Sequence, residues 1–426
     1  MIALVWVSFS IWIAIPWIYN TSNVVGVVLS VLIISGIAFI PGYIIAFIYS
    51  TIAHGKIKDY RYENVSDDVS ILISAYNEED NILDTILSII NQKYLGKCEI
   101  VIVNDGSIDN TDAIISDFIK DNDLVSDISF VYINLDKNVG KSQALNIGLS
   151  KVSNEVLVTL DADSVMHDNA LQTIVNHLVN SDSDVVSVAG AILSSNTDTS
   201  FMTKIQDWDY KIGINAIKRA QSIYQNVLVT QGAFSCFYTS AVREVGGWKD
   251  TVGEDIVLTW DLLNKKYKTE YEPHAILYTN TPTTYRQFFN QRRRWSRGLV
   301  EAFKHAWGNL FKIRKGMLYF WVNLAFPFID IVFTFVFVPS IILALFFQYY
   351  LFVGALTLLI IPLSIMVTLL IYHKQKRTFQ LNNIDISTNF LYLFLFVIMY
   401  QFIQVPATLS GYASEIINLS KTWGTK

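Results

Sequence analysis

The chain alternates between long segments without any charged side chain and a charged middle region. The uncharged segments are 2–18, 24–49, 331–372 and 390–412. A helix needs about 20 apolar residues to cross a bilayer, so we expect two spanning helices within 1–50 and about three within 317–412, followed by a tail at 413–426. A composition of 52% hydrophobic and 16% charged residues agrees with a membrane protein. We therefore expect a soluble domain inserted between transmembrane helices.

Basic residues gather beside the uncharged segments. Lys56 and Lys58 follow the second segment, Arg292 to Arg294 precede the third, and Lys374 lies before the last. Because loops rich in lysine and arginine stay in the cytoplasm, we expect a multi-pass plasma-membrane protein with a cytoplasmic central domain and membrane lipid as a partner. The formal net charge of −5 gives no support to a nucleic-acid partner.

Between residues 67 and 180 the chain alternates short β-branched runs with helical stretches. The expected strands are 69–74, 100–103, 130–133 and 156–160, and the expected helices are 79–91, 109–120 and 141–149. This alternation predicts βαβ units and a largely parallel sheet, so we expect one α/β domain over 51–280. Cys98 and Cys236 lack a metal-like spacing, and we expect both to be packing residues.

Acidic residues stand where three of these strands end. Tyr76 and Glu78 follow the first, Asp105 the second, and Asp161 and Asp163 the fourth. An open α/β sheet binds its ligand at the carboxyl ends of its strands, and paired aspartates suit Mg²⁺ or Mn²⁺ on a diphosphate. We predict that Asp163 and Asp161 bind a divalent metal. Asp105 is expected to accept from the imide N–H of uracil, with Tyr76 and Glu78 near the base and ribose. Ordinary turn chemistry and a solvated loop are the structural alternatives.

Three later charged residues extend the candidate site. Lys141 follows Gly140 at the start of an expected helix, where it is a phosphate contact or a solvated lysine. Glu254 and Asp255 precede an apolar helical stretch. A carboxylate there can remove a proton from an attacking hydroxyl, so both are candidate catalytic residues, with Asp255 as the base. The structural alternative is that the two acids favour a helix N-terminus.

Segment 281–316 contains a helical pattern with an aromatic face. Its face is Trp295, Leu299, Phe303 and Leu310, opposite Arg293, Arg297 and Lys304. We expect this helix at the membrane interface, and Arg292 or Arg293 on anionic lipid. An earlier aromatic face, at Phe201, Ile205, Trp208 and Ile212, fits the interface or the domain core equally well.

The same segment holds three candidate substrate residues. The guanidinium of Arg294 can bind a diphosphate through two donors, and the indole of Trp295 gives a sugar ring a stacking face. Gln291 completes this set on the expected helix.

These motifs resemble those of the processive, membrane-integrated family 2 glycosyltransferases. The matching series is Asp105, then Asp161 with Asp163, then Glu254-Asp255, then Gln291 with Arg294-Trp295, within 69–298. The resemblance implies a GT-A catalytic domain with a Rossmann-like, mixed and largely parallel sheet. It also implies a UDP-sugar donor, a growing polysaccharide acceptor, Mg²⁺ or Mn²⁺, inversion at the anomeric carbon, export through the enzyme's own helices, and a small accessory membrane subunit as a further partner.

Within this family the chain is most similar to the poly-β-1,6-N-acetylglucosamine synthases, in stretches 205–210 and 217–222. UDP-GlcNAc is therefore the expected donor and an exopolysaccharide the expected product. Gly253 stands where threonine is usual, and 291–298 is as similar to cellulose synthases. A cellulose- or hyaluronan-like synthase with another UDP-sugar, and nonprocessive transfer of one sugar to a lipid acceptor, remain open. A degenerate transferase domain in a transporter or receptor is disfavoured, because every motif carboxylate is present.

Overall fold

The structure is a computed structural model that describes residues 2–121, 127–308, 317–353, 355–384 and 389–419. The chain divides into two compact units, one of residues 1–56 and 317–419 and the other of residues 57–316. The first unit is helical and the second is α/β.

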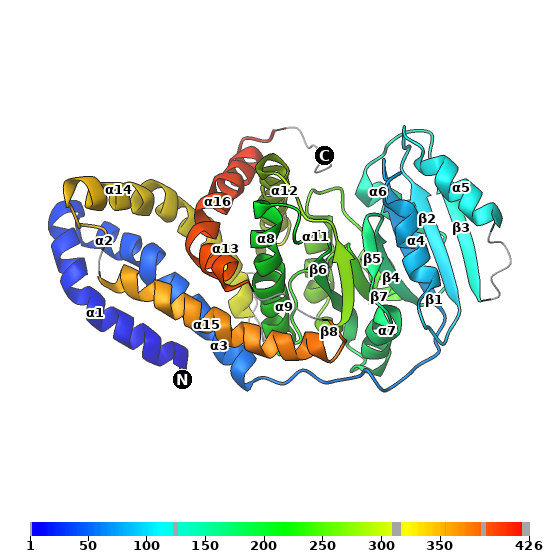
Figure 1. Cartoon of the computed structure of the whole chain (residues 1–426), viewed down its shortest axis with the longest axis horizontal. Coiled ribbons are helices and arrows are strands. Elements are labelled where there is room, and N and C mark those ends of the chain that lie inside the picture. The colour runs from blue at the N-terminus through cyan, green and yellow to red at the C-terminus, as the bar shows by residue number, and fades with distance from the viewer. Residues whose placement is uncertain (1, 122–126, 309–316, 354, 385–388, 420–426) are drawn as a thin grey trace. The chain divides into compact units, whose positions relative to one another are not determined.

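The α/β unit is built on one mixed sheet (Figure 1). In the described residues its strand order is β3-β2-β1-β4-β7-β6-β8-β5. The strands are β1 (Val69–Ala75), β2 (Cys98–Asn104), β3 (Ile128–Asn134), β4 (Val156–Asp161), β5 (Ser164–Met166), β6 (Val185–Ser194), β7 (Phe234–Tyr238) and β8 (Lys268–Thr279). Strands β3, β2, β1 and β4 are parallel, as are β6 and β8, whereas β7 and β5 run antiparallel to their neighbours. The predicted largely parallel α/β sheet is confirmed.

Ten helical segments of this unit are described. They are α4 (Ile82–Ile90), α5 (Thr111–Asp121), α6 (Lys141–Leu149), α7 (Ala170–Asn180), α8 (Phe201–Trp208), the π-helix η2 (Asp209–Ile214), α9 (Asn215–Ser222), α10 (Thr239–Glu244), α11 (Glu254–Asn264) and α12 (Tyr285–His305). The three helices expected between the first strands are all present. Helix α4 begins three residues later than expected because the preceding residues form a turn, in which Asn81 N–H donates to the Glu78 carbonyl (3.0 Å).

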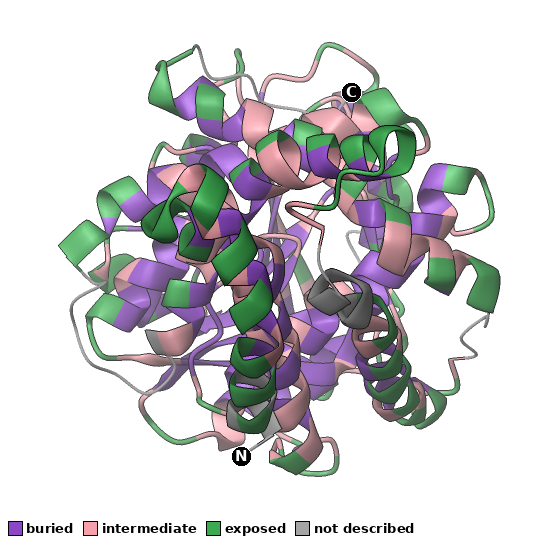
Figure 2. Ribbon diagram, turned by 90° about the vertical axis from the view of Figure 1, so that its left-hand side faces the viewer, coloured by how far each residue is buried: buried purple, intermediate pink, exposed green. Residues whose placement is uncertain are grey.

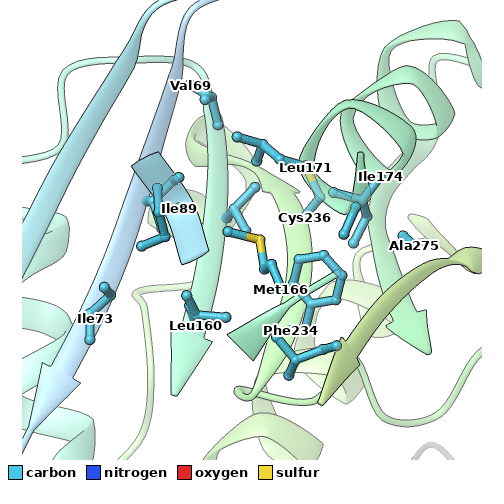
Figure 3. Packing of buried hydrophobic residues seen from close by; sticks show 14 of the residues in the cluster. Val69, Ile73, Ile89, Leu160, Met166, Leu171, Ile174, Phe234, Cys236 and Ala275 are labelled. Atoms are coloured by element: carbon cyan, nitrogen blue, oxygen red, sulfur yellow. The ribbon is translucent and has the colours of Figure 1, made fainter. Parts of the chain in front are cut away.

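Helices cover both faces of the sheet. Alternate side chains of a strand point to opposite faces, so Ile71 and Ile73 pack with Ile86 of α4, while Leu72 packs with Leu145 of α6. Helices α5 and α7 add to the first face, and α10 and α11 add to the second. Figure 3 shows the first core, where side chains of β1, α4, β4 and β7 meet. Cys98 and Cys236 are both buried there without a disulfide, as predicted.

The helical unit contains the predicted apolar segments. Its elements are α1 (Ile2–Val25), α2 (Val27–Ile34), η1 (Ser35–Phe39), α3 (Ile40–His54), α13 (Met317–Val332), η4 (Phe333–Phe337), α14 (Val338–Phe347), α15 (Ala355–Gln380) and α16 (Phe390–Ile416). Within the described residues, three helical stretches are long and apolar enough to cross a membrane: Val27–His54, Leu318–Phe347 and Phe390–Ile416. Helices α1 and α15 stand where the remaining two spans are predicted.

Apolar side chains of these helices are open to the surroundings. Val28 of α2 is 75% exposed and Phe346 of α14 is 77% exposed. Figure 2 colours exposed residues green. Contiguous apolar exposure of this kind is unusual for a soluble monomer. Together with the three spans, it indicates a membrane protein.

One span begins earlier than the uncharged segment predicts. Leu318–Phe347 includes Asp330, a carboxylate that ends the uncharged run when the sequence is read alone. Its Oδ1 accepts from Gln401 Nε2 (3.0 Å), and its Oδ2 accepts from Thr408 Oγ1 (2.7 Å) and the Tyr412 hydroxyl (3.1 Å). Polar residues inside a membrane are retained where partners satisfy them. Helix α16 therefore supplies the hydrogen bonds that allow an aspartate in α13.

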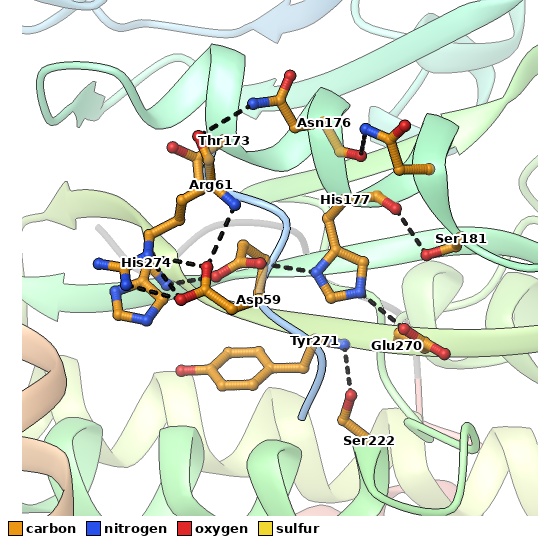
Figure 4. A network of polar contacts seen from close by, with 12 residues as sticks. Asp59, Arg61, Thr173, Asn176, His177, Ser181, Ser222, Glu270, Tyr271 and His274 are labelled. Carbon is orange, nitrogen blue, oxygen red and sulfur yellow. Dashed lines mark hydrogen bonds and ion pairs between the residues drawn. The ribbon is translucent and has the colours of Figure 1, made fainter. Parts of the chain in front are cut away.

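A buried polar network joins α7 to β8 (Figure 4). His177 Nε2 lies 2.7 Å from Glu270 Oε2, and His177 Nδ1 lies 2.7 Å from Glu272 Oε2. Burial acts to lower the pKa of His177, but the hydrogen bonds to the two glutamates outweigh it and raise the pKa to about 9. The imidazolium therefore fixes α7 against the sheet as long as it stays protonated.

This network makes stability depend on pH. The folded pKa of His177 is above the unfolded value of about 6.5, so its stabilisation is complete below pH 6.5 and is lost as the pH rises through 9. The slope approaches about 1.4 kcal/mol per pH unit inside that window. We expect the thermal unfolding midpoint of the purified protein to fall between pH 6.5 and 9, and His177→Gln to remove that fall. His167→Gln is the control and should keep it; a flat wild-type profile would contradict the assignment.

Candidate active site

The parallel register gathers the predicted acidic residues at one edge of the sheet. Ala75, the last residue of β1, pairs with Asn104 at the end of β2, and Ser74 pairs with Asp161 at the end of β4. Tyr76, Asp105 and Asp161 therefore leave neighbouring strands at the same level, which is the edge that the sequence predicts.

Asp105 holds the loop that leads into α6. Its Oδ1 accepts from Val139 N–H (2.7 Å) and its Oδ2 accepts from Gly140 N–H (3.0 Å). Burial raises the pKa of Asp105, against the lowering effect of these two amides. Gly106 follows with φ 68°, and a Cβ there would lie 2.4 Å from the Lys137 carbonyl carbon, so the turn requires glycine. The turn alternative for Asp105 is therefore present in the structure, and a contact with a base would have to use the remaining lone pairs of the same carboxylate.

Lys141 joins two of the predicted motifs. Its ammonium lies 2.6 Å from Asp161 Oδ1 and 3.8 Å from Glu254 Oε1. Burial acts to lower the pKa of Lys141, but the two carboxylates outweigh it, so the pKa is raised and the side chain stays charged. Its ammonium also lies 3.4 Å from where a Cβ on Gly232 would be. Lys141 is thus a half-buried counter-ion of the site rather than a solvated lysine.

Asp163 lies close to other carboxylates. Burial, followed by the charges of Asp161 and Glu78, raises the pKa of Asp163 to about 6. No group of three or more histidine, cysteine, aspartate or glutamate side chains is arranged as a metal site in the described part of the chain. The pair Asp161 and Asp163 nevertheless fits Mg²⁺, which commonly binds one or two carboxylates and takes its other ligands from water and substrate phosphates.

Glu254 and Asp255 occupy the first turn of α11, where carboxylates suit the positive end of the helix dipole. Glu254 is buried, and burial raises its pKa to about 7 despite the opposing charge of Lys141. Asp255 is partly exposed, and its Oδ1 accepts from Ile256 N–H (2.8 Å). Of the two, Asp255 is the carboxylate that an incoming molecule can reach.

Helix α12 presents the third motif. Thr284 caps it, accepting from Gln287 N–H, and Gln287 caps back in return. In the described chain, the buried Gln291 Oε1 and Arg294 Nε have no hydrogen-bond partner. The positive charge of Arg294 acts to lower the pKa of both Lys141 and Glu254, so its guanidinium lies near both groups. Trp295 is 37% exposed. The helix therefore brings the guanidinium of Arg294 near Glu254 and leaves the Trp295 indole partly open.

Two glycines set the distance between α11 and α12. A Cβ on Gly298 would lie 2.7 Å from the Cα of Gly253, and Glu301 Oε2 accepts from Val252 N–H (2.5 Å). Gly253 is the position where relatives usually have threonine. Its replacement by glycine here coincides with a backbone approach that leaves no room for a side chain.

The prediction that α12 lies at the membrane interface is wrong for several of its residues. Arg292 is buried and its Nη2 lies 2.8 Å from Asp209 Oδ2, so it is not a lipid contact; Arg297 is also buried. Phe303 packs edge-on against Trp260, with ring centroids 5.0 Å apart. Leu310 lies outside the described residues. For the earlier aromatic face, Ile205, Trp208 and Ile212 are buried, which is the domain-core alternative, while Phe201 is 45% exposed.

Comparison with known proteins agrees with this arrangement. Residues 70–246 match the model of glycosyl transferase family 2. The similarity to this family therefore covers most of the α/β unit. Over 255 residues it is 34% identical to poly-β-1,6-N-acetyl-D-glucosamine synthase of Staphylococcus epidermidis, and over 252 residues it is 34% identical to the enzyme of that name from Staphylococcus aureus strain MSSA476. Each match spans 59% of this chain and 59% of the relative.

A solved structure shares the fold of this chain. The mannosyltransferase PcManGT from Pyrobaculum calidifontis, in complex with GDP-Man and Mn²⁺, superposes with a TM-score of 0.61 and 14% identity. The match covers 92% of this chain and 98% of that chain. At this identity the likeness concerns the fold, which is of the GT-A type predicted from the sequence.

Three charged or polar residues of the α/β unit have no role predicted from the sequence. Asp209 pairs with Arg292, and Tyr210 is buried among Arg292, Asp209, Asp163 and Gln291, with burial raising its pKa to about 12. Burial lowers the pKa of Lys218 to about 7, against the charge of Asp255. Asp209, Tyr210 and Lys218 lie in the stretches that resemble the N-acetylglucosamine synthases, and that resemblance was the available signal.

The glycine contact between α11 and α12 can be tested. Gly298→Ala places a methyl group against the backbone of Gly253, and overpacking of this kind costs about 1–3 kcal/mol. We expect a lower unfolding midpoint in thermal or denaturant unfolding of the purified protein. Gly308→Ala is the matched control, because no atom of the described residues lies within 4 Å of a Cβ at that position. Equal midpoints for Gly298→Ala and the wild type would show that the helices adjust freely.

Proposed function

We propose that this chain is an inverting glycosyltransferase that uses UDP-GlcNAc to extend a β-linked polysaccharide. One observation carries the proposal: the ammonium of Lys141 lies between Asp161 and Glu254. This contact brings two of the motifs together at the strand ends, in a chain similar to glycosyl transferase family 2. The choice of sugar rests on the 34% identity to poly-β-1,6-N-acetylglucosamine synthases.

The donor diphosphate is proposed to lie between Asp161, Asp163 and Arg294. The two aspartates would hold Mg²⁺ or Mn²⁺, because crowding leaves Asp163 with a raised pKa and a place for positive charge. A divalent cation bound there would neutralise charge on the leaving diphosphate. Arg294, whose Nε has no partner among the described residues, would donate to the diphosphate. Lys141 would contact the phosphates once they take the place of its present partner, Asp161.

The uridine is proposed to lie beside Tyr76, Glu78 and Asp105. Tyr76 is 44% exposed, so its ring is available to a base, and Asp105 offers acceptor oxygens next to it. Glu78 Oε2 accepts from Asn81 Nδ2 (2.8 Å), which orients the carboxylate toward the same strand end. A ribose hydroxyl can donate to that carboxylate.

The transfer is proposed to be one displacement. The acceptor hydroxyl oxygen attacks the anomeric carbon, and the bond from that carbon to the phosphate oxygen breaks, so UDP leaves with the electron pair. Asp255 takes the hydroxyl proton. Glu254 lies buried behind it and is a positioning carboxylate for Lys141. An α-linked donor then gives a β-linked product.

The acceptor and the membrane belong to the same proposal. The open face of Trp295 would stack on the end of the polysaccharide, which the family's layout exports through the enzyme's own helices. A cytoplasmic catalytic domain is supported by basic residues at the ends of spans: Lys374 Nζ donates to the Ile52 and Ala53 carbonyls (2.8 and 2.9 Å), which brings the basic end of α15 to the end of α3. Membrane lipid and a small accessory membrane subunit are the further partners we propose.

A donor panel tests the proposed function. Purified enzyme in lipid nanodiscs, supplied with divalent cation, should release UDP from UDP-GlcNAc and form a polymer of N-acetylglucosamine, as measured by UDP release and product sizing. Preferred turnover of UDP-glucose, or of UDP-glucuronate with UDP-GlcNAc, would replace the proposed sugar by that of a cellulose- or hyaluronan-like synthase. A product with one added sugar would indicate nonprocessive transfer, and no UDP release from any donor would contradict the proposal.

The base assignment predicts a selective loss. Asp255→Asn cannot take the proton, so turnover should fall by about 10²–10⁴, while donor binding measured by calorimetry stays near the wild-type value. Asp261→Asn is the control on the same helix, where the carboxylate pairs with His305 (2.8 Å). If donor affinity collapses and turnover of bound donor does not, Asp255 is a binding residue.

Arg294 and Trp295 should separate donor from acceptor. Trp295→Ala removes the aromatic surface on which the acceptor sugar would stack, so it should shorten the product more than it weakens UDP-GlcNAc binding. Arg294→Ala should do the reverse. Donor affinity and product length measured for both variants decide this. Unchanged chain length with Trp295→Ala would make Trp295 a packing residue.

A further inference from the structure

The π-helical turn η2 brings a carboxylate against the helix that bears Trp295. Asp209, the first residue of η2, has its Oδ2 at 2.8 Å from Arg292 Nη2, although 83 residues separate them. Both side chains are nearly covered, at 11% and 4% exposure. A π-helical turn inside a longer helix is a frequent mark of a functional position.

The Arg292 guanidinium lies over Trp295. Its central carbon is 4.1 Å from the Trp295 ring centroid and 5.0 Å from that of Phe288. These residues stand three and four positions from Arg292 on α12, which places them on one face of the helix. A guanidinium placed over an aromatic face is attracted to the ring, so Arg292 holds this face of the indole. With one face against Arg292, Trp295 still has 37% of its surface exposed, which leaves another face for a ligand.

The turn has the shape that this carboxylate needs. A Cβ on Gly213 would lie 2.5 Å from Asp209 Oδ1, so glycine leaves room for the carboxylate. The next residue, Tyr210, is buried beside Gln291 and Arg292. Two successive residues of η2 therefore face successive residues of the α12 motif.

We propose that Asp209 is a positioning residue for the acceptor sugar, acting through Arg292 to hold the indole of Trp295 as a flat stacking surface. This inference rests on the proposed function and adds to it a residue that does not touch the substrate. Without the carboxylate, the buried guanidinium of Arg292 loses its ion pair with Asp209 and turns toward other acceptors. The ring of Trp295 then loses the group that packs on one of its faces.

Two variants break the relay from Asp209 through Arg292 to Trp295 at different points. Asp209→Asn removes the charge that holds Arg292, and Arg292→Lys keeps a positive charge but removes the planar group that stacks. Asp207→Asn is the matched control. Asp207 lies two residues earlier, in α8, and is equally buried, and it pairs with Lys211 (2.5 Å) instead of Arg292. All are made in the full chain in nanodiscs.

The first readout is kinetic. With UDP-GlcNAc and a soluble β-linked N-acetylglucosamine oligosaccharide as acceptor, we expect Asp209→Asn and Arg292→Lys to raise the acceptor KM by roughly ten- to a hundred-fold, the scale of a misplaced binding group. The calorimetric donor affinity should stay unchanged. Asp207→Asn should change neither. Equal loss of donor and acceptor binding in Asp209→Asn would indicate a general structural role and overturn the proposal.

The second readout needs no turnover. In protein labelled with 5-fluorotryptophan, the ¹⁹F resonance of Trp295 is assigned by its absence in Trp295→Phe. We expect it to shift or broaden in Asp209→Asn and Arg292→Lys and to keep its position in Asp207→Asn. An unchanged resonance in Asp209→Asn, or the same change in Asp207→Asn, contradicts the relay. If the wild type transfers no sugar, the proposed function fails, and the comparison of resonances still decides whether Asp209 holds Trp295.

Discussion

The ammonium of Lys141 joins the two halves of the candidate site. It lies 2.6 Å from Asp161 at the end of β4 and 3.8 Å from Glu254 at the start of α11. Asp163 and Glu78 add negative charge at the same strand ends, where burial already disfavours ionised carboxylates. Lys141 compensates this charge only in part, because the pKa of Asp163 remains raised. A divalent cation would fit the negative charge that is left over, and the cation would in turn attract a diphosphate.

The first half of the sheet could be predicted from the sequence. Strands β1 to β4 are local apolar runs, each followed by its own helix or loop, and the acids after Ala75, Asn104 and Leu160 mark where they end. Strands β5 to β8 were not predicted. Strand β7 pairs antiparallel with β4 through residues such as Phe234 and Leu160, which are far apart in the chain, and such pairing leaves no local pattern.

The candidate site was likewise predicted only in part from the sequence. The motif residues were found because each stands at the end of a predictable element. The role of Arg292 was missed because three adjacent arginines look alike in a sequence, and only the distant Asp209 distinguishes the buried one. The start of the span that contains Asp330 was missed for a related reason. A charge ends an apolar run locally, while its partners Gln401, Thr408 and Tyr412 lie on another helix.

The central claim is that the strand-end carboxylates bind the donor together with a divalent cation, and calorimetry tests it most directly. UDP-GlcNAc is titrated into the wild type and into Asp163→Asn, each with Mg²⁺ and with excess chelator. The account predicts that Mg²⁺ tightens donor binding to the wild type by about 5- to 150-fold, the usual range of coupling between two ligands, and that Asp163→Asn removes this effect. Equal donor affinity with and without the cation in the wild type would contradict it.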